Sequence, residues 1–178
     1  MASSFTDHIR LLTDDELSML VRLRPDLIIP VPADFAALGT RAQSRVSVGR
    51  ALDGLNQFTL QVLDALRMTC TDGVACVPTV LEMAAQSGVA DTAVLPAIEA
   101  LTQRLLVYGD ATAPTVVPTV EEVSSPYLTG LGRPAVDLGE DAALLAADPA
   151  RLRRTLLAAP PPARAALDRL AAGPPIGT

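Results

Sequence analysis

The chain has 178 residues, a length that suits one ordinary domain or two small ones. Its 14 basic residues face 20 acidic ones, and the resulting charge of −6 argues against an anionic membrane surface or a nonspecific coat on DNA as its partner. All of the basic residues are Arg. Because the chain contains no Lys, it has no GxxxxGKS/T phosphate-binding loop, and ATP hydrolysis of that class is excluded.

The sequence predicts a cytoplasmic protein without a metal or a cofactor. It shows no signal peptide and no run of about 18 apolar residues, so no membrane contact is expected. Thiols stay reduced in the cytoplasm, and we interpret Cys70 and Cys76 as ordinary buried or loop thiols, although a bridge across the turn between them is geometrically possible. The single histidine, His8, leaves no set of zinc ligands.

Residues 1–54 predict a small helical bundle. The first eight residues look disordered or variable. Thr13 and Glu16 form a capping box that opens the first helix, and an extended connector follows that helix. Gly39 is expected to end the second helix and to separate it from the third. The expected helices cover residues 14–23, 32–39 and 40–52.

Residues 55–123 predict a winged helix, with three short helices followed by a β-hairpin. Apolar residues recur at three- and four-residue steps in the first and third helices. Pro96 removes a hydrogen bond inside a helix, so the regular part of the third helix is expected to begin only at about Val94. Pro118 confines the return strand to an edge or to its last residues. The expected elements are a helix capped by Asn56, a helix over 79–86 opened by Thr79 with Glu82, a helix from 94, and strands over 105–108 and 114–120.

Winged helices usually bind nucleic acids, but the charges of this module argue against that function. Residues 56–123 contain two Arg against eight Asp or Glu. A DNA-binding surface draws most of its affinity from neutralising phosphates, so this module by itself is expected to bind DNA poorly. Arg104 and Gln103 lie at the far end of the predicted recognition helix from the usual base-reading positions, which disfavours specific base readout.

Residues 124–178 predict an irregular segment followed by helices. A short helix is expected over 141–146, and Asp148 caps the next one. Three prolines from Pro160 separate it from a last helix that stops at Gly173. The sequence ALDRL in that helix resembles VLDAL in the preceding module, which suggests the start of a second winged helix, with a chance match as the alternative. Apolar residues expected to hold the irregular segment are Tyr127, Leu128 and Leu131.

Two groups of Arg are the candidate binding residues, and the sequence indicates no catalytic site. One group lies in the predicted bundle and the other in the helix after Asp148. Each suits a phosphate backbone or an acidic partner. The alternative for the first group is a solvated face with ion pairs to Asp34 or Asp53, and for the second an ordinary surface helix, which in a chain without Lys must use Arg. The adjacent Glu121 and Glu122 are expected to be solvated rather than catalytic. The candidate contacts are Arg41, Arg45, Arg50, Arg151, Arg153 and Arg154.

Three segments carry a resemblance to a known family. They are LTDDELSMLVRLRPDLIIPVPADFAALGTRAQSRVSVGRALDGLNQFTLQVLDAL, SSPYLTGLGRPAVDL and LLAADPARLRRTLLAAPPPARAALDRLAAGPP. Together they resemble the N-terminal part of an actinobacterial helicase-associated family described as carrying a helicase XPB N-terminal-like domain. The resemblance implies DNA repair or transcription-coupled work beside an XPB-type helicase, without motor motifs in this region and without a catalytic residue. Family members are longer, so the chain is expected to be an N-terminal fragment.

The sequence therefore predicts a mainly α-helical, non-enzymatic scaffold, in which a helical bundle packs on a winged helix and C-terminal helices follow. Its expected role is protein interaction in a helicase-associated protein, with an XPB-type helicase as a candidate partner. Two alternatives remain open: a DNA-binding module that uses the Arg-rich helices, and a homodimerisation domain. Convergence of the Arg residues on one face favours DNA, whereas their use in ion pairs favours a protein partner.

Overall fold

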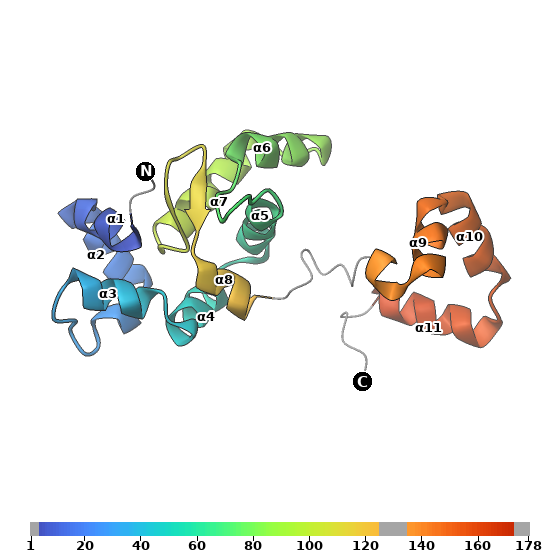
Figure 1. The fold of residues 1–178 in the computed structure, drawn as a ribbon, viewed down its shortest axis with the longest axis horizontal. Coiled ribbons are helices and arrows are strands. Elements are labelled where there is room, and N and C mark those ends of the chain that lie inside the picture. The colour runs from blue at the N-terminus through green and yellow to red at the C-terminus, as the bar shows by residue number, and fades with distance from the viewer. Residues whose placement is uncertain (1–3, 125–134, 173–178) are drawn as a thin grey trace. The chain divides into compact units, whose positions relative to one another are not determined.

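The computed structural model describes residues 4–124 and 135–172 and is mainly helical, as predicted (Figure 1). The chain divides into two compact units, Met1–Thr129 and Gly130–Thr178. Helices of the first unit are α1 Phe5–Leu11, α2 Asp14–Leu23, the 3-10 helix η1 Pro25–Ile28, α3 Phe35–Ala42, α4 Arg45–Asp53, α5 Gln57–Met68, α6 Val77–Gln86, α7 Asp91–Thr102 and α8 Pro118–Val123. Its strands are β1 Val107–Gly109 and β2 Pro114–Val116. The second unit contains η3 Ala135–Leu138, α9 Glu140–Ala147, α10 Pro149–Ala158 and α11 Pro161–Ala172.

Helix α1 corrects the expectation of disorder for residues 4–8. Ser4 caps this helix, and Phe5 and Ile9 are buried one turn apart. The Phe5 ring packs edge-on against Tyr108, with the ring centroids 5.0 Å apart and the ring planes at 82°. Burial of the aromatic ring and of Ile9 offsets the entropy cost of ordering this segment.

The boundary between α3 and α4 differs from the prediction. Gly39 does not end a helix; it lies inside α3, where an added Cβ would come within 3.2 Å of Thr6 Oγ1 in α1. The glycine therefore lies at a close contact between the two helices, where a Cβ would require Thr6 to shift, rather than at a turn. The break falls instead at Gln43, and Ser44 caps α4. Helix α3 begins at Phe35, later than predicted, because the preceding Asp34 carboxylate accepts a hydrogen bond from a backbone N–H of its first turn.

Two helix starts after residue 55 also need correction. The predicted cap Asn56 is confirmed, with its side chain accepting a hydrogen bond from Thr59 N–H. Helix α6, however, begins at Val77, so Thr79 lies within its first turn and its hydroxyl donates to Cys76 Sγ. Helix α7 begins at Asp91 and includes Pro96, which the sequence had placed near its start. Burial of the α7 face that carries Val94, Ala97, Ile98 and Leu101 keeps the helix continuous through the proline.

The hairpin is shorter than predicted and has a third partner. Strand β2 pairs antiparallel with β1 and ends at Val116. Pro118 does not lie on a return strand; it opens α8, where its missing N–H removes no helical hydrogen bond. The loop between α5 and α6 reaches the free edge of β2, with a bridge between Val74 and Thr115. Ala75 N–H donates to Pro114 O at 2.8 Å.

Helix α8 ties the N-terminal helices to the α5–α7 segment. Glu121 accepts hydrogen bonds from the buried Arg67 of α5 at 2.8 and 2.7 Å. The next residue, Glu122, accepts from Arg45 of α4 at 2.7 Å. The Glu121 and Glu122 side chains are 54% and 46% exposed, so the predicted solvation is confirmed, and each one also pairs with a cation on a different helix. The Thr119 hydroxyl adds a hydrogen bond to the α3–α4 junction.

Arg24 is a buried connection within the first unit. Its side chain is 1% exposed, and its guanidinium donates to Ala42 O and Ser47 Oγ at 2.7 Å and to Arg104 O at 2.8 Å. These carbonyls lie at or just beyond the C-terminal ends of α3 and α7, where helices leave acceptors unsatisfied. Burial lowers the Arg24 pKa to about 10, and the nearby Asp26 opposes that shift. The guanidinium is thus charged at neutral pH and joins three helices.

The second unit has helices where the sequence predicts them but no deep core. The predicted cap Asp148 is confirmed, since its carboxylate accepts from Arg151 N–H at 2.9 Å. Among residues 135–169 no side chain is buried, and Leu144 and Leu157 are 55% and 66% exposed. The predicted contacts of Tyr127, Leu128 and Leu131 and the stop at Gly173 lie outside the described residues.

No helix in the described part of the chain combines the length and the apolar character that a membrane crossing requires.

Candidate protein-docking groove

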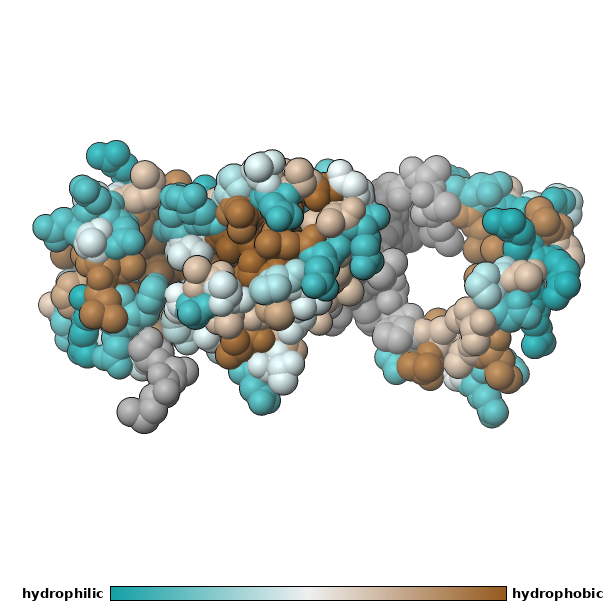
Figure 2. Space-filling view, turned by 90° about the horizontal axis from the view of Figure 1, so that it is seen from above, coloured by the Kyte–Doolittle hydropathy of each residue, from teal (hydrophilic) through white to brown (hydrophobic). Residues whose placement is uncertain are grey.

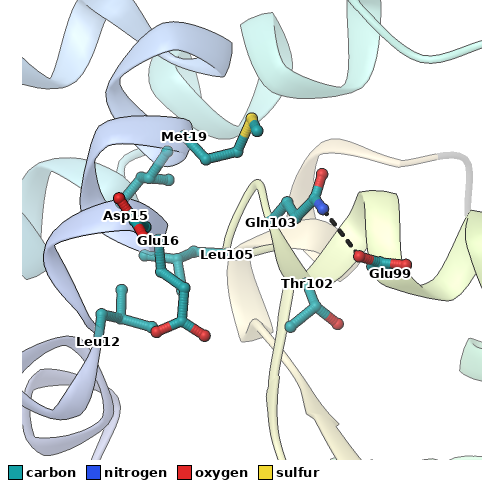
Figure 3. Close-up of a pocket in the computed structure, with 9 residues that line it drawn as sticks. Leu12, Asp15, Glu16, Met19, Glu99, Thr102, Gln103 and Leu105 are labelled. Carbon is teal, nitrogen blue, oxygen red and sulfur yellow. Dashed lines mark hydrogen bonds between the residues drawn. The ribbon is translucent and has the colours of Figure 1, made fainter.

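A groove with a volume of about 330 Å³ lies between α2 and the end of α7 in the first unit (Figure 3). One wall comes from the α1–α2 corner and the first half of α2, and the other comes from the last turn of α7 and the turn after it. The lining combines apolar side chains with carboxylates and two neutral polar residues. These residues are Leu12, Asp15, Glu16, Met19, Leu20, Glu99, Thr102, Gln103 and Leu105.

The α2 wall is anchored from beneath and open above. Leu20 is 1% exposed and holds the helix to the core, whereas the preceding Met19 is 39% exposed. Successive helical residues are rotated by about 100°, so the two neighbours differ in burial although both line the groove. The Thr13 capping box fixes the first turn, which carries Asp15 and Glu16.

The opposite wall is built by the turn that ends α7. Leu106 N–H donates to Leu101 O at 3.0 Å, and Leu105 has φ +51°. This is a Schellman turn with Leu in the left-handed position that Gly usually takes. The conformation costs a side-chain-bearing residue about 1 kcal/mol. Leu105 is only 1% exposed, so burial of its side chain beside the groove offsets the strain.

The rim of the groove is negatively charged. Asp15 and Glu16 project from α2, and Glu99 lies across from them on α7 (Figure 3). Hydrogen bonds from the Thr13 backbone and hydroxyl hold the pKa of Glu16 below its ordinary value, so that carboxylate is ionised at neutral pH. Gln103 Nε2 donates one hydrogen bond to Glu99, at 3.1 Å. None of the nine lining residues is Arg or His.

The first predicted Arg group is mostly used within the fold. The predicted helix over 40–52 would hold both Arg41 and Arg45. The structure instead places Arg41 on α3 and Arg45 on α4, because the break at Gln43 separates them. Arg41 donates to Leu27 O and Pro30 O, and Arg45 pairs with Glu122. Arg50 is exposed and borders a separate hollow next to Arg24. The structure does not gather these three side chains into one cationic site.

The second predicted Arg group lies on α10. Arg151, Arg153 and Arg154 are exposed, and no guanidinium hydrogen bond or ion pair of theirs occurs among the described residues. Residues 135–172 contain five Arg and five Asp or Glu, so their formal charges cancel. These three residues therefore form a local cationic segment, while the rest of residues 135–172 carries two Arg against five Asp or Glu.

The described residues contain no group of three or more His, Cys, Asp or Glu side chains that could hold a metal ion. Cys70 and Cys76 are free thiols. Burial raises the pKa of the Cys70 thiol, while the hydrogen bond from Thr79 lowers that of Cys76. Neither thiol lies beside a histidine that would activate it for catalysis among the residues described.

The groove residues were not identified as a site from the sequence. Asp15 and Glu16 are explained locally as residues of a helix N-terminus, and Glu99 counts only toward the negative charge of its segment. At least 79 positions separate the lining residues of the two walls. The one local signal is Met19, an apolar residue at the margin of the α2 stripe that is too exposed to belong to the core.

Comparisons with protein-family models, with curated proteins and with solved structures gave no match for this chain. The groove and the Arg residues are therefore interpreted from their own chemistry.

Proposed function

We propose that the first unit is a winged-helix-type protein-interaction module and that the chain is a non-enzymatic scaffold. The order of elements supports this arrangement: helix, short bridging segment, two helices and a hairpin. In this interpretation α7 is the recognition helix, α6 precedes it, and the β1–β2 hairpin is the wing. The Val74–Thr115 bridge takes the place of the short strand that precedes the second helix of such modules.

The charge of α7 is the observation that carries the protein-interaction function. Residues Asp91–Thr102 contain no cation, and the exposed side of the helix includes Asp91, Leu95 and Glu99. The nearest cation, Arg104, donates back to Ala100 O at 2.9 Å. A recognition helix with acidic and apolar side chains gains nothing from DNA phosphates but suits a protein surface.

An XPB-type helicase is the partner that we propose, with work in DNA repair or transcription as the context. This part of the proposal is supported by the sequence resemblance alone. The test is isothermal titration of the whole chain with a purified actinobacterial XPB-type helicase. Saturable binding is expected, and absence of heat at micromolar concentrations at two temperatures about 15 °C apart would refute the helicase as partner, because the enthalpy of an apolar association changes with temperature.

The same preparation should be titrated with labelled duplex, forked and single-stranded DNA over a salt series. The proposed function predicts no binding by the first unit, even at low salt. DNA binding that weakens steeply with salt and is lost when Arg45 or Arg50 is changed to Ala would overturn it, since such binding would require phosphate contacts.

DNA binding through α10 is a second candidate function, favoured by the exposure of its Arg group. If this candidate is correct, changing Arg151, Arg153 and Arg154 together to Ala abolishes the salt-dependent binding. The matched control changes Arg164 and Arg169 of α11, which are also exposed. Equal losses in both variants would indicate only a general charge effect.

A further inference from the structure

We infer that the groove between α2 and the end of α7 binds a cationic amphipathic helix of a partner protein. One large apolar side chain of that helix enters the groove, and Arg or Lys side chains next to it meet the acidic rim. The inference rests on the proposed protein-interaction function and names the segment that the partner supplies.

The inside of the groove accounts for the apolar anchor. Leu12, Met19 and Leu105 come from two walls and face the same hollow, whose volume of about 330 Å³ is in the range of pockets that hold ligand groups. Helical peptides bind such grooves through large apolar residues spaced three or four positions apart. Exposed apolar side chains also occur elsewhere on the first unit (Figure 2), but the groove combines a hollow with charge of one sign.

The rim decides the charge of the occupant. Three carboxylates, Asp15, Glu16 and Glu99, border the groove, and no lining residue carries a compensating positive charge. An acidic or phosphorylated segment meets repulsion there, whereas Arg or Lys side chains find partners on both walls. Charge complementarity therefore selects a basic segment over an acidic one.

The secondary structure of the groove walls indicates whether the bound segment is extended or helical. An extended peptide binds by adding a strand to an exposed sheet edge. Every residue that lines this groove belongs to α2, to α7 or to the turns next to them. The groove therefore presents side chains rather than free backbone groups, and a helix with an apolar stripe matches it.

The first experiment measures fluorescence anisotropy of a labelled four-turn peptide with a Leu stripe flanked by Arg, titrated with the whole chain. The Asp15→Asn, Glu99→Gln double variant should weaken binding about five- to tenfold, from the loss of two exposed ion pairs. The matched control, Glu82→Gln with Asp53→Asn, removes two exposed carboxylates outside both the lining and α7, and should leave affinity within about twofold. The same peptide with Glu in place of Arg should not bind.

A second pair of variants separates the groove from general surface charge. Met19→Arg places a cation in the groove and should abolish binding of the Arg peptide. Met68→Arg places one on the exposed end of α5, outside the lining, and should lower affinity much less. Both side chains are partly exposed, and a thermal melt monitored by circular dichroism must show that both variants remain folded.

The outcomes distinguish this inference from the proposed function. Failure of the Arg peptide to bind, or equal binding by the Asn/Gln variant, overturns the groove assignment even when the helicase binds the chain. Peptide binding without helicase binding supports the groove and refutes the helicase as partner. Self-association in sedimentation that Met19→Arg removes would assign the groove to a second copy of this chain and overturn the partner helix.

Discussion

Glu121 and Glu122 are neighbours on α8, but their ion pairs differ in environment. The Arg67 side chain that Glu121 meets is 2% exposed, whereas the Arg45 side chain that Glu122 meets is 73% exposed. A buried guanidinium depends on its acceptors, because it has no water to replace them. An exposed pair contributes little, since solvent screens both charges.

Replacing each glutamate by Ala tests this difference within one helix. Glu121→Ala should lower the free energy of unfolding by about 2 kcal/mol, because it removes two charge-assisted hydrogen bonds while Asp64 still pairs with Arg67. Glu122→Ala should change it by less than about 0.5 kcal/mol. Urea unfolding at neutral pH measures both, and equal effects would show that α8 is not held through Arg67.

His8 should make the free energy of unfolding depend on pH at values above those at which the carboxylates titrate. Burial lowers the His8 pKa from its ordinary 6.5, an effect that the charge of Glu16 partly opposes. Its Nε2 atom is buried and has no hydrogen-bond partner among the residues that the structure describes. The unfolded chain therefore binds a proton at higher pH than the folded one. Stability should be complete above pH 6.5 and fall as the pH drops through the lowered folded pKa.

The check is urea unfolding of wild type and His8→Gln at pH 7.5 and 5.5. The wild type should lose stability between these values, and the variant should lose clearly less. The carboxyls of Glu16 and Glu121 do not interfere, because hydrogen bonds hold both of their pKa values below the ordinary 4.5. The same loss in both proteins would assign the pH dependence to another group.

At the scale of elements, Pro96 is the least favourable residue of α7. It is exposed, and its ring removes the backbone hydrogen bond that its position would otherwise make. Pro96→Ala should therefore raise stability by about 1 to 3 kcal/mol, reduced by the greater freedom of Ala in the unfolded chain. Pro118→Ala is the matched control at the first position of α8, where no gain is expected. Thermal melts compare the stabilities of the two variants. A gain in stability for Pro118→Ala but not for Pro96→Ala would contradict the prediction that Pro96 destabilises α7.

Local signals predicted the helices well and their partners poorly. The capping residues Thr13, Asn56 and Asp148 are all confirmed, because each acts on the backbone within three residues of itself. Gly39 was misinterpreted as a helix end because its role depends on Thr6, 33 positions away. The sequence predicted that Glu121 and Glu122 are solvated, which is confirmed, but it did not indicate their pairing with Arg67 and Arg45.

The candidate site was least accessible to sequence reasoning for the same reason. Charge composition correctly gave an acidic α5–α7 segment, but no spacing relates Asp15 to Glu99. The Arg residues were easy to find, yet their roles depend on distant carbonyls and carboxylates. A groove between two segments that lie far apart in the chain is a property of packing and has no period in the sequence.

At the scale of the whole molecule, the two units differ in the amount of core. The first unit buries side chains from α1 through α8 in one cluster, including Leu20, Leu66, Leu101 and Val120. In the second unit, Val136, Leu144 and Leu157 remain more than half exposed, and none of residues 135–169 is buried. Small helical units without a core have little stability of their own.

Hydrogen exchange read by mass spectrometry should therefore separate the units. Amides of α5 and α7 should exchange slowly, because opening them exposes the core, and amides of α9 to α11 should exchange much faster. Repeating the measurement over a wide range of protein concentration also tests homodimerisation. Protection of α9 to α11 that rises with concentration would mean that a second copy covers the exposed leucines. Protection of α9 to α11 equal to that of α5 at every concentration would contradict the prediction that the second unit is less stable than the first.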